Sequence, residues 1–464
     1  MSFARLFSTR SFEEAAMRAI GLDIHRDFCE VAIAEGGRVR AAGRVGTAPA
    51  EIEAFAGGLG PGDTVTLEAT GNALAIARLI EPHARVVLAN PKATRAATRL
   101  RAKTDRIDAR TLAQLLASGF LPEVWTGDEA THALRRRVGR RVHLVRQRTK
   151  AKNQVHAVLL RTLAGRPPVS DVFGTRGRAW LERLVLPDDE RETLEACLRT
   201  VDFLDTEVAA LDRALAPLVL ASPDMRRLLT LPGVSATTAA TLLGVIGDIA
   251  RFPTPGRLVA YVGLDPRVSQ SGNDPAHHGR ISKQGASEAR HVLVEAAWVA
   301  TRTAGPLRAF AQRLAARRGW NIAIVAVARK LTVIAWHMLT RGEDYAFARP
   351  ILVRAKLREI ELRAGAPRVK GRSIGVAPTA AERELERELE RELAVAAEVA
   401  YERLVKDWVP SRKQVREPQA GRASHDAERQ PARQGSAPTL RFGSASLPHQ
   451  GDYAPDSGQR QDGT

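Results

Sequence analysis

Four carboxylates in the first quarter of the chain have residue types and spacing that suit metal-dependent chemistry. Asp23 lies in the run GLDIH, and Glu68 ends the apolar and β-branched run TVTLE. Asp105 and Asp108 are three residues apart, so on a helix they share one face. Each acid therefore falls where a strand or helix could present it to one common site.

Carboxylates that converge on one site repel each other unless divalent cations neutralise them, and such oxygen ligands suit Mg²⁺ or Mn²⁺. Two ions about 4 Å apart can activate the attacking oxygen of a phosphodiester displacement and stabilise the leaving oxygen. The four acids therefore predict a site for two Mg²⁺ or Mn²⁺ ions that acts on phosphodiesters. In the alternative interpretation, Asp105 is a helix N-cap and Asp108 its N3 partner, each stabilising the helix by ~1 kcal/mol or less.

The elements that must position these acids form a mixed α/β sheet. Residues 19–46 predict three strands in a β-meander, with the turn at 35–37. Strands then alternate with helices, which favours an α/β arrangement. We expect helices at about 49–57 and 72–80, strands ending at 68 and 89, and helical stretches from 91 and from about 104 to 117. One acid on the first strand, one on a later strand and a pair on a following helix are typical of an RNase H-like nuclease core.

A long basic helix follows. Residues 131–161 contain ten Lys or Arg and no acid, while their apolar residues keep a helical spacing. A second helical stretch, about 187–217, has balanced charge, so the two could pair as an antiparallel coiled-coil arm. An ordinary solvated helix pair is the alternative. Because uncompensated positive charges repel each other, we expect contacts with nucleic-acid phosphates, assigned to Arg135, Arg136, Arg137, Arg140 and Arg141.

Residues 222–345 predict a mostly helical unit. Its start, LLTLPGVSATTAATLLGVIG, places a turn at LPGV between two helices, with Ser235 as the cap of the second. This pattern is typical of a phosphate-binding helix-hairpin-helix, and a plain helical hairpin is the alternative. A helix at 256–262, a polar loop at 265–285 and helices near 286–303 and 320–340 complete the unit.

Composition indicates several domains and a polyanionic partner. A chain of 464 residues is too long to fold around a single hydrophobic core. Its 70 Lys and Arg residues against 52 Asp and Glu residues give a net charge of +18. Nucleic acid is the leading partner for such a charge, although a GC-rich genome also enriches Arg. Cys29 and Cys197 lack disulfide or zinc spacing, which fits a reducing cytoplasm. No apolar run approaches the ~18 residues of a membrane span, so no membrane is expected.

Taken together, GLDIH, LEATGN and KTDRIDARTLA resemble the DEDD motif of the IS one-ten family of insertion-sequence transposases, whose N-terminal domain is similar to the Holliday-junction resolvase RuvC. The later runs LLTLPGV, AYVGLDPRVSQSG and GRISKQG resemble the C-terminal transposase domain of the same family. The resemblance covers roughly residues 18–345. It implies a bacterial, cytoplasmic and nucleoid-associated DNA transposase and recombinase.

This resemblance, together with the composition of the segments that lie outside it, predicts a set of domains. We expect an N-terminal extension at 1–17, a RuvC-like DEDD catalytic domain at 18–125, a basic helical coiled-coil arm at 126–220, a C-terminal transposase domain at 221–350, a charged helical extension at 351–409 and a disordered tail at 410–464.

Carried over residue by residue, the resemblance makes Asp23, Glu68, Asp105 and Asp108 the catalytic metal ligands and Ser271 the nucleophile. It implies a covalent serine–DNA intermediate, guidance by an element-encoded structured RNA, and assembly into dimers and a tetramer. Ser269 and Ser282 are competing serines near Ser271. Arg267, Arg280 and Lys283 are expected to bind nucleic acid around the serine, and solvated surface charges are the alternative interpretation.

Two other functions stay open at this point. A RuvC-like junction-resolving nuclease that uses water would need the four carboxylates and no serine. A non-catalytic nucleic-acid-binding protein descended from a transposase would need neither. His277 and His278 are adjacent on one loop, a spacing that seldom brings two imidazoles to one ion, and they receive no role.

Overall fold

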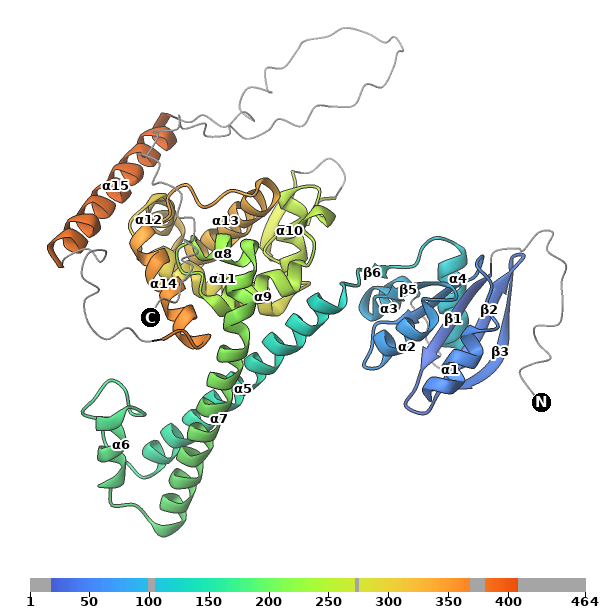
Figure 1. The fold of residues 1–464 in the computed structure, drawn as a ribbon, viewed down its shortest axis with the longest axis horizontal. Helices are drawn as coiled ribbons and strands as arrows, with labels where there is room; N and C mark the ends of the chain where they lie inside the picture. Colours follow the sequence, from blue (N-terminus) through green and yellow to red (C-terminus); the bar gives the residue numbers. More distant parts are fainter. Residues whose placement is uncertain (1–17, 99–104, 272–274, 368–379, 408–464) are drawn as a thin grey trace, which may run out of the picture. The chain divides into compact units, whose positions relative to one another are not determined.

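The structure is a computed structural model that describes residues 18–98, 105–271, 275–367 and 380–407 (Figure 1). The expected extension at 1–17 and the expected disordered tail at 410–464 lie outside these residues.

The N-terminal part contains the mixed sheet that the sequence predicts. Its strands are β1 (Ala19–Ile24), β2 (Phe28–Glu35), β3 (Arg38–Gly46), β4 (Thr64–Glu68), β5 (Arg85–Ala89) and β6 (Glu123–Val124), in the order β3-β2-β1-β4-β5-β6. The antiparallel β1–β2–β3 meander is confirmed, and β4 and β5 continue the sheet parallel to β1. The two-residue β6 pairs antiparallel with β5 and is too short for a periodic signal.

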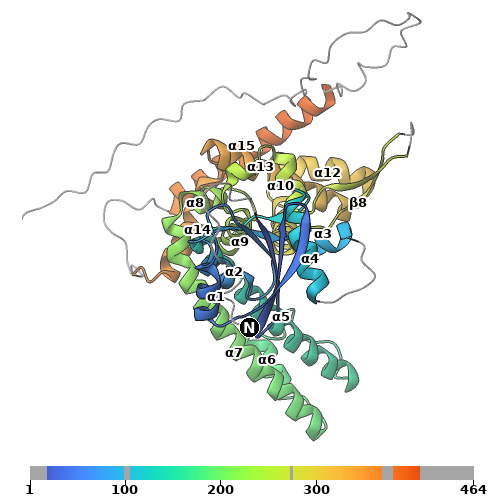
Figure 2. The same cartoon turned by 90° about the vertical axis from the view of Figure 1, so that its right-hand side faces the viewer.

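Helices cover both faces of this sheet. Figure 2 shows α1 (Pro49–Ala56) and α2 (Ala73–Ile80) on one face and α4 (Asp105–Ala117) on the other. The first face is packed with large aliphatic side chains, among them Ile20, Leu22, Val65 and Leu67. The second face is lined by the small residues Ala19, Ala32 and Ala34, which pack against Ala109 and Ala113 of α4. Small side chains on both partners let α4 lie close to the strands. A further helix, α3 (Pro91–Thr98), follows β5.

Helix α4 lies very close to the sheet at Gly21. A Cβ atom on Gly21 would lie 2.2 Å from the carbonyl oxygen of Ala109 and 2.6 Å from the amide nitrogen of Ala113. Both are backbone atoms of α4 and have no freedom to rotate away. Glycine at position 21 is therefore required for the helix to pack on β1.

Two long helices follow the sheet. They are α5 (Glu129–Arg161) and α7 (Asp188–Ala221), which lie side by side in Figure 1 and are joined through the short helix α6 (Thr175–Glu182). Val155, Val158, Leu194 and Cys197 pack between them at the α6 end. Acids of α7 pair with arginines of α5, and the Arg141 guanidinium donates to both carboxylate oxygens of Asp212, at 2.5 and 3.1 Å.

A single core joins the remaining helices. They are α8 (Pro223–Leu229), α9 (Ala236–Ile246), α10 (Pro255–Val262), α11 (Ser287–Ala300), α12 (Pro306–Arg318), α13 (Trp320–Arg341) and α14 (Pro350–Arg363). The expected polar loop at 265–285 is a two-stranded hairpin instead, with β7 (Pro266–Ser269) antiparallel to β8 (His277–Ile281). Its strands are short and polar, so no apolar alternation marked them. The last helix described is α15 (Ala380–Asp407).

Among the described residues one helix, α13, is long and apolar enough to cross a membrane by length and composition. Half of its apolar window is buried inside the protein, and Ile324, Val327 and Leu331 belong to the core of the helical unit. Arg329 and Lys330 interrupt the apolar run, which is why the sequence indicated no membrane span. In this fold α13 is a core helix.

We predict that Gly21→Ala lowers the free energy of unfolding by about 1–3 kcal/mol, because the new methyl group forces α4 away from β1. Chemical denaturation of the purified variant measures this change. Gly71→Ala is the control in the same part of the chain, since a Cβ there meets no atom within 4 Å. It should change stability by less than about 0.5 kcal/mol. Equal effects of the two substitutions would contradict the packing account.

Candidate active site

Asp23 and Glu68 lie on the same face of the sheet, at the ends of neighbouring strands. The parallel pairing of β1 with β4 matches Leu22 with Leu67, so Asp23 and Glu68 follow as the next positions. Leu22 and Leu67 both point into the α1/α2 core. Because successive side chains of a strand alternate between faces, Asp23 and Glu68 both project toward the α4 face.

Helix α4 brings the second pair of acids to this place. Asp105 and Asp108 lie in its first turn, immediately before Ala109, whose carbonyl oxygen faces Gly21. Gly21 and Asp23 are two residues apart on β1 and so share a face. The contact at Gly21 therefore sets the first turn of α4 beside Asp23.

The residues in direct reach of one another are Asp23, His25 and Asp105. The Nε2 atom of His25 lies 3.2 Å from Oδ2 of Asp23 and 3.4 Å from Oδ2 of Asp105. One potential ligand atom from each of the three residues lies within 4.8 Å of the others. The predicted acids Glu68 and Asp108 are outside this group of three.

Asp108 acts on the site through its charge. Burial raises the pKa of Asp23 above its usual value, and the negative charges of Asp108 and Asp105 raise it further, whereas His25 lowers it. Among the described residues, three of the four predicted acids, Asp23, Asp105 and Asp108, therefore interact electrostatically. Strand register places Glu68 beside Asp23.

His25 is the one site residue that the sequence analysis missed. It lies in the same GLDIH run as Asp23, two residues further on, where the strand alternation returns to the same face. That spacing was the available signal. A histidine that bridges two carboxylates can hold both in a fixed orientation, in the way that outer partners orient metal ligands.

The donor set of this group fits a divalent cation. Carboxylate oxygens are the ligands that Mg²⁺ and Mn²⁺ prefer, and imidazole is accepted more readily by Mn²⁺ and later transition metals. Asp23 is only partly accessible, with 17% of its side chain exposed, whereas 49% of the Asp105 side chain is exposed. The group therefore has one ligand fixed in the fold and one that is open to solvent and to a substrate.

Ser271 lies just after β7 and is exposed. The hairpin carries Arg267 on β7 and Arg280 on β8, and both side chains are exposed. Two of the predicted cations therefore lie on the two-stranded sheet whose first strand leads to Ser271. Residues 272–274, which follow Ser271, lie outside the described part of the chain. Lys283 comes after β8 and has a positive φ of 54°.

The competing serine at 282 has a structural role. Its Oγ donates to Oδ1 of Asp265 at 2.6 Å, and its backbone nitrogen donates to the carbonyl oxygen of Asp265 at 2.8 Å. These bonds close the base of the hairpin. Ser269 remains on β7, paired with His277.

Two glycines allow the hairpin to leave the helical unit. Gly263 has a φ of +77° and Gly285 a φ of +98°. A Cβ on Gly285 would lie 2.1 Å from the carbonyl oxygen of Tyr261, and one on Gly263 would lie 2.2 Å from the carbonyl oxygen of Gln284. The runs VGLDP and SKQG, which the sequence analysis singled out, thus form the crossing at the hairpin base.

The predicted basic contacts on α5 divide into two kinds. Arg135 and Arg141 are engaged within the protein: Arg135 donates to the carbonyl oxygens of Gly244 and Val245 at 2.5 and 3.2 Å, and Arg141 pairs with Asp212. Arg136 and Arg140 are exposed and pair with Glu129 and Glu207. Arg137 is exposed.

The premise that the positive charges of α5 lack counter-charges is therefore wrong, because acids of α7 approach them in the fold. A single helix read along the sequence does not show which acids pack beside it.

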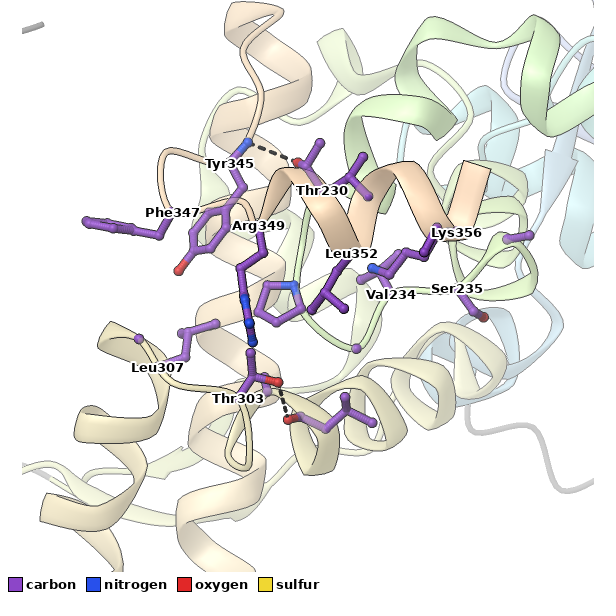
Figure 3. A pocket seen from close by; sticks show the side chains of 18 of the residues that line it. Thr230, Val234, Ser235, Thr303, Leu307, Tyr345, Phe347, Arg349, Leu352 and Lys356 are labelled. Carbon is purple, nitrogen blue, oxygen red and sulfur yellow. Dashed lines mark hydrogen bonds between the residues drawn. The ribbon is translucent and has the colours of Figure 1, made fainter. Parts of the chain in front are cut away.

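The turn at LPGV joins α8 to α9, and Ser235 caps α9 as predicted, since its Oγ accepts from the nitrogen of Thr238 at 3.2 Å. The turn lines a cavity of about 450 Å³ that α14 and the α11–α12 connection complete (Figure 3). Lys356 of α14 donates to the carbonyl oxygens of Leu229 and Leu231 at 2.7 and 3.1 Å. The cavity is mostly apolar and holds none of the predicted catalytic residues.

We predict that Gly285→Ala destabilises the hairpin base, at a cost of about 1–3 kcal/mol for the left-handed backbone alone. The measurement is the thermal unfolding midpoint, together with proteolysis of the hairpin. Gly279→Ala on β8 is the matched control, because its Cβ would lie 3.7 Å from the nearest atom. A hairpin that tolerates both substitutions equally would show that Gly285 is not required.

Two family models match this chain. Residues 20–163 match a family model described as a transposase with the DEDD motif of IS110, and residues 225–312 match the model of the transposase IS116/IS110/IS902 family. Together the two matches span half of the chain. The first contains Asp23, Glu68, Asp105 and Asp108, and the second contains Ser271.

Three relatives illustrate the similarity. The transposase for insertion sequence element IS1328 of Yersinia enterocolitica is 29% identical over 53% of this chain and 74% of its own length. The transposase for IS1111A of Coxiella burnetii is 28% identical over 52% of this chain and 68% of its own. A pilin gene-inverting protein of Moraxella lacunata is 28% identical over 30% of this chain and 45% of its own.

Both matched segments occur in the order expected for one family, and the mixed sheet followed by mostly helical structure fits an RNase H-like DEDD domain. The chain belongs to the IS110 family of transposases, enzymes that act on DNA by cleaving and recombining it.

Proposed function

We propose that this transposase cleaves and exchanges DNA strands at a site built from the acids of the sheet domain and Ser271. The observation that carries the proposal is the convergence of Asp23, His25 and Asp105 within 4.8 Å, beside Asp108 and Glu68. Clustered acids of this kind are costly without a counter-charge, and a divalent cation or a cationic group supplies it.

Asp23, Glu68, Asp105 and Asp108 would hold one or two Mg²⁺ or Mn²⁺ ions, which supply Lewis-acid stabilisation of a phosphodiester oxygen. Asp23 is fixed by β1 and by its contact with His25. The first turn of α4 carries Asp105 and Asp108 and is partly open, so a DNA phosphate can approach. His25 keeps the carboxylates of Asp23 and Asp105 oriented toward each other.

In the proposed reaction the Oγ of Ser271 attacks a DNA phosphorus. An Oγ–P bond forms, the P–O bond to the leaving deoxyribose oxygen breaks, and the serine proton passes to solvent or to that leaving oxygen. The product is a phosphoserine–DNA intermediate, from which a DNA hydroxyl can regenerate the serine in strand exchange. The exposure of Ser271 and the internal bonding of Ser282 support this choice of serine.

Nucleic acid is held by the exposed cations around these groups. Arg267 and Arg280 flank the serine on the hairpin, with Lys283 at its base, and Arg136, Arg137 and Arg140 offer an exposed row on α5. Guidance by an element-encoded structured RNA, and assembly of subunits into dimers and a tetramer, belong to the same proposal. A site shared between subunits would join the acids of one to the serine of another.

We predict that Asp23→Asn lowers metal-dependent strand cleavage by about 100-fold or more, since loss of an outer partner of a metal ligand already costs about 10–100-fold. Cleavage of a labelled element end, titrated with Mg²⁺ and Mn²⁺, measures the effect. The control is Asp27→Asn, because 85% of the Asp27 side chain is exposed at the turn between β1 and β2. Full cleavage by the Asp23 variant would refute a catalytic role for this cluster.

A second prediction separates the serine mechanism from hydrolysis by water. Ser271→Ala should abolish a denaturant-resistant protein–DNA adduct and strand exchange, while Ser282→Ala should keep the adduct and lose about 1 kcal/mol of stability with its hydrogen bond. Gel analysis of labelled DNA after denaturation detects the adduct. If the Ser271 variant still cleaves DNA and the wild type forms no adduct, the protein acts as a nuclease that uses water.

A further inference from the structure

Helix α15 is an acidic helix in a basic protein. Its 28 residues contain nine acids and five bases, whereas the whole chain has a net charge of +18. The helix lies beyond the segment that the transposase family models match, which ends at residue 312. None of the residues proposed for catalysis lies on this helix.

The helix is attached through charges and hydrogen bonds rather than through an apolar face. None of the described residues of α15 is buried. Leu385, Leu389 and Leu393, which form its apolar row, are 59%, 51% and 70% exposed. Ionic contacts weaken as salt rises, so a helix that is held by them and has no buried apolar residue can be displaced by a competing anion.

Glu398 binds the beginning of α12. Its Oε1 accepts from the backbone nitrogen of Gly305 at 2.7 Å, and its two oxygens accept from Nε and Nη2 of Arg308, each at 2.7 Å. This is the arrangement of an anion at a helix N-terminus with a bidentate arginine, which phosphates also adopt.

Glu390 binds the beginning of α14 in the same way. Its Oε1 accepts from the backbone nitrogen of Ile351 at 2.7 Å, and its Oε2 lies 3.5 Å from Nε of Arg349. The Oε2 atom of Glu390 and the Nε atom of Arg349 are both buried and lack a hydrogen bond. The carboxylate therefore leaves part of this site unsatisfied, and a phosphate has more oxygens with which to fill it.

The surface under α15 is basic beyond these two points. Helix α12 carries Arg308, Arg313, Arg317 and Arg318 and no acid. Arg313 contacts the hydroxyl of Tyr401 at 3.4 Å, and Arg354 of α14 pairs with Glu386 at 2.7 Å. Arg349, which is labelled in Figure 3, also lines the cavity beside the LPGV turn.

The two glutamates are eight residues apart, which is about 12 Å along a helix. The two sites that they occupy are therefore far enough apart for each to take a separate phosphate.

We propose that the face formed by α12 and the beginning of α14 binds nucleic-acid phosphates, and that α15 is a displaceable acidic helix that occupies this face until nucleic acid replaces it. The proposal rests on the proposed function in that DNA is the polyanion this enzyme meets. It concerns binding alone, and its test is run without divalent metal, so failure of the catalytic proposal leaves the result unaffected.

The test compares two double variants of the full chain in binding to a short fluorescent DNA duplex, by anisotropy in EDTA over a range of salt. Glu390→Gln with Glu398→Gln should bind on the order of tenfold tighter than wild type. The slope of log affinity against log salt should stay close to that of wild type, because DNA contacts the same phosphates in both proteins once α15 has left the face. Glu388→Gln with Glu392→Gln removes the same charge from exposed positions of the helix and should change neither value appreciably.

Adding Arg308→Ala to the first pair should reverse the gain. Equal tightening by both pairs would show an effect of net charge alone and overturn the proposal, as would an unchanged affinity in the first pair. Hydrogen exchange of the wild-type chain provides a test that needs no variant: saturating DNA should speed exchange of the amides of 380–407. Exchange that DNA leaves unchanged or slows would also overturn it.

Discussion

The close contact between β1 and α4 at Gly21 is the constraint on which the candidate active site depends. Backbone atoms of α4 occupy the space where a side chain at position 21 would be, so the helix has one position along the strand. That position places Asp105 and Asp108 beside Asp23, and the register of β1 with β4 adds Glu68. Acids that are far apart in the chain thus meet because two backbones touch and two strands are in register.

The two faces of the sheet carry side chains of different size, and this difference makes the contact possible. Large aliphatic residues fill the α1/α2 face, and most of the burial free energy of the domain comes from there. On the opposite face, β1 and β2 meet α4 through alanine and glycine, so this contact contributes less burial and allows a closer approach. The functional face is therefore the less strongly packed of the two.

In the helical part of the chain, arginines of one helix pair with acids of another. The arginines of α5 that face α7 find acids there, and the arginines that begin α12 and α14 find the acids of α15. The first set is integral to the pairing of two long helices. The second set is held by a helix with no buried residue among those described, so this helix has no buried apolar contact to keep it in place when a competing anion binds the arginines.

The sequence by itself determined the elements and the chemistry of single residues. Period-two runs predicted the meander, the helical periods predicted α4, α5, α7, α11 and α13, and the two motif blocks indicated the family, because such patterns are local. Tertiary structure decided which groups meet. It added His25 to the acids, paired Ser282 with Asp265, turned the expected polar loop into the β7–β8 hairpin, and supplied counter-charges to α5. These outcomes depend on strand register, on backbone contacts at Gly21 and Gly285, and on helices that pack from distant parts of the chain, none of which a local pattern specifies.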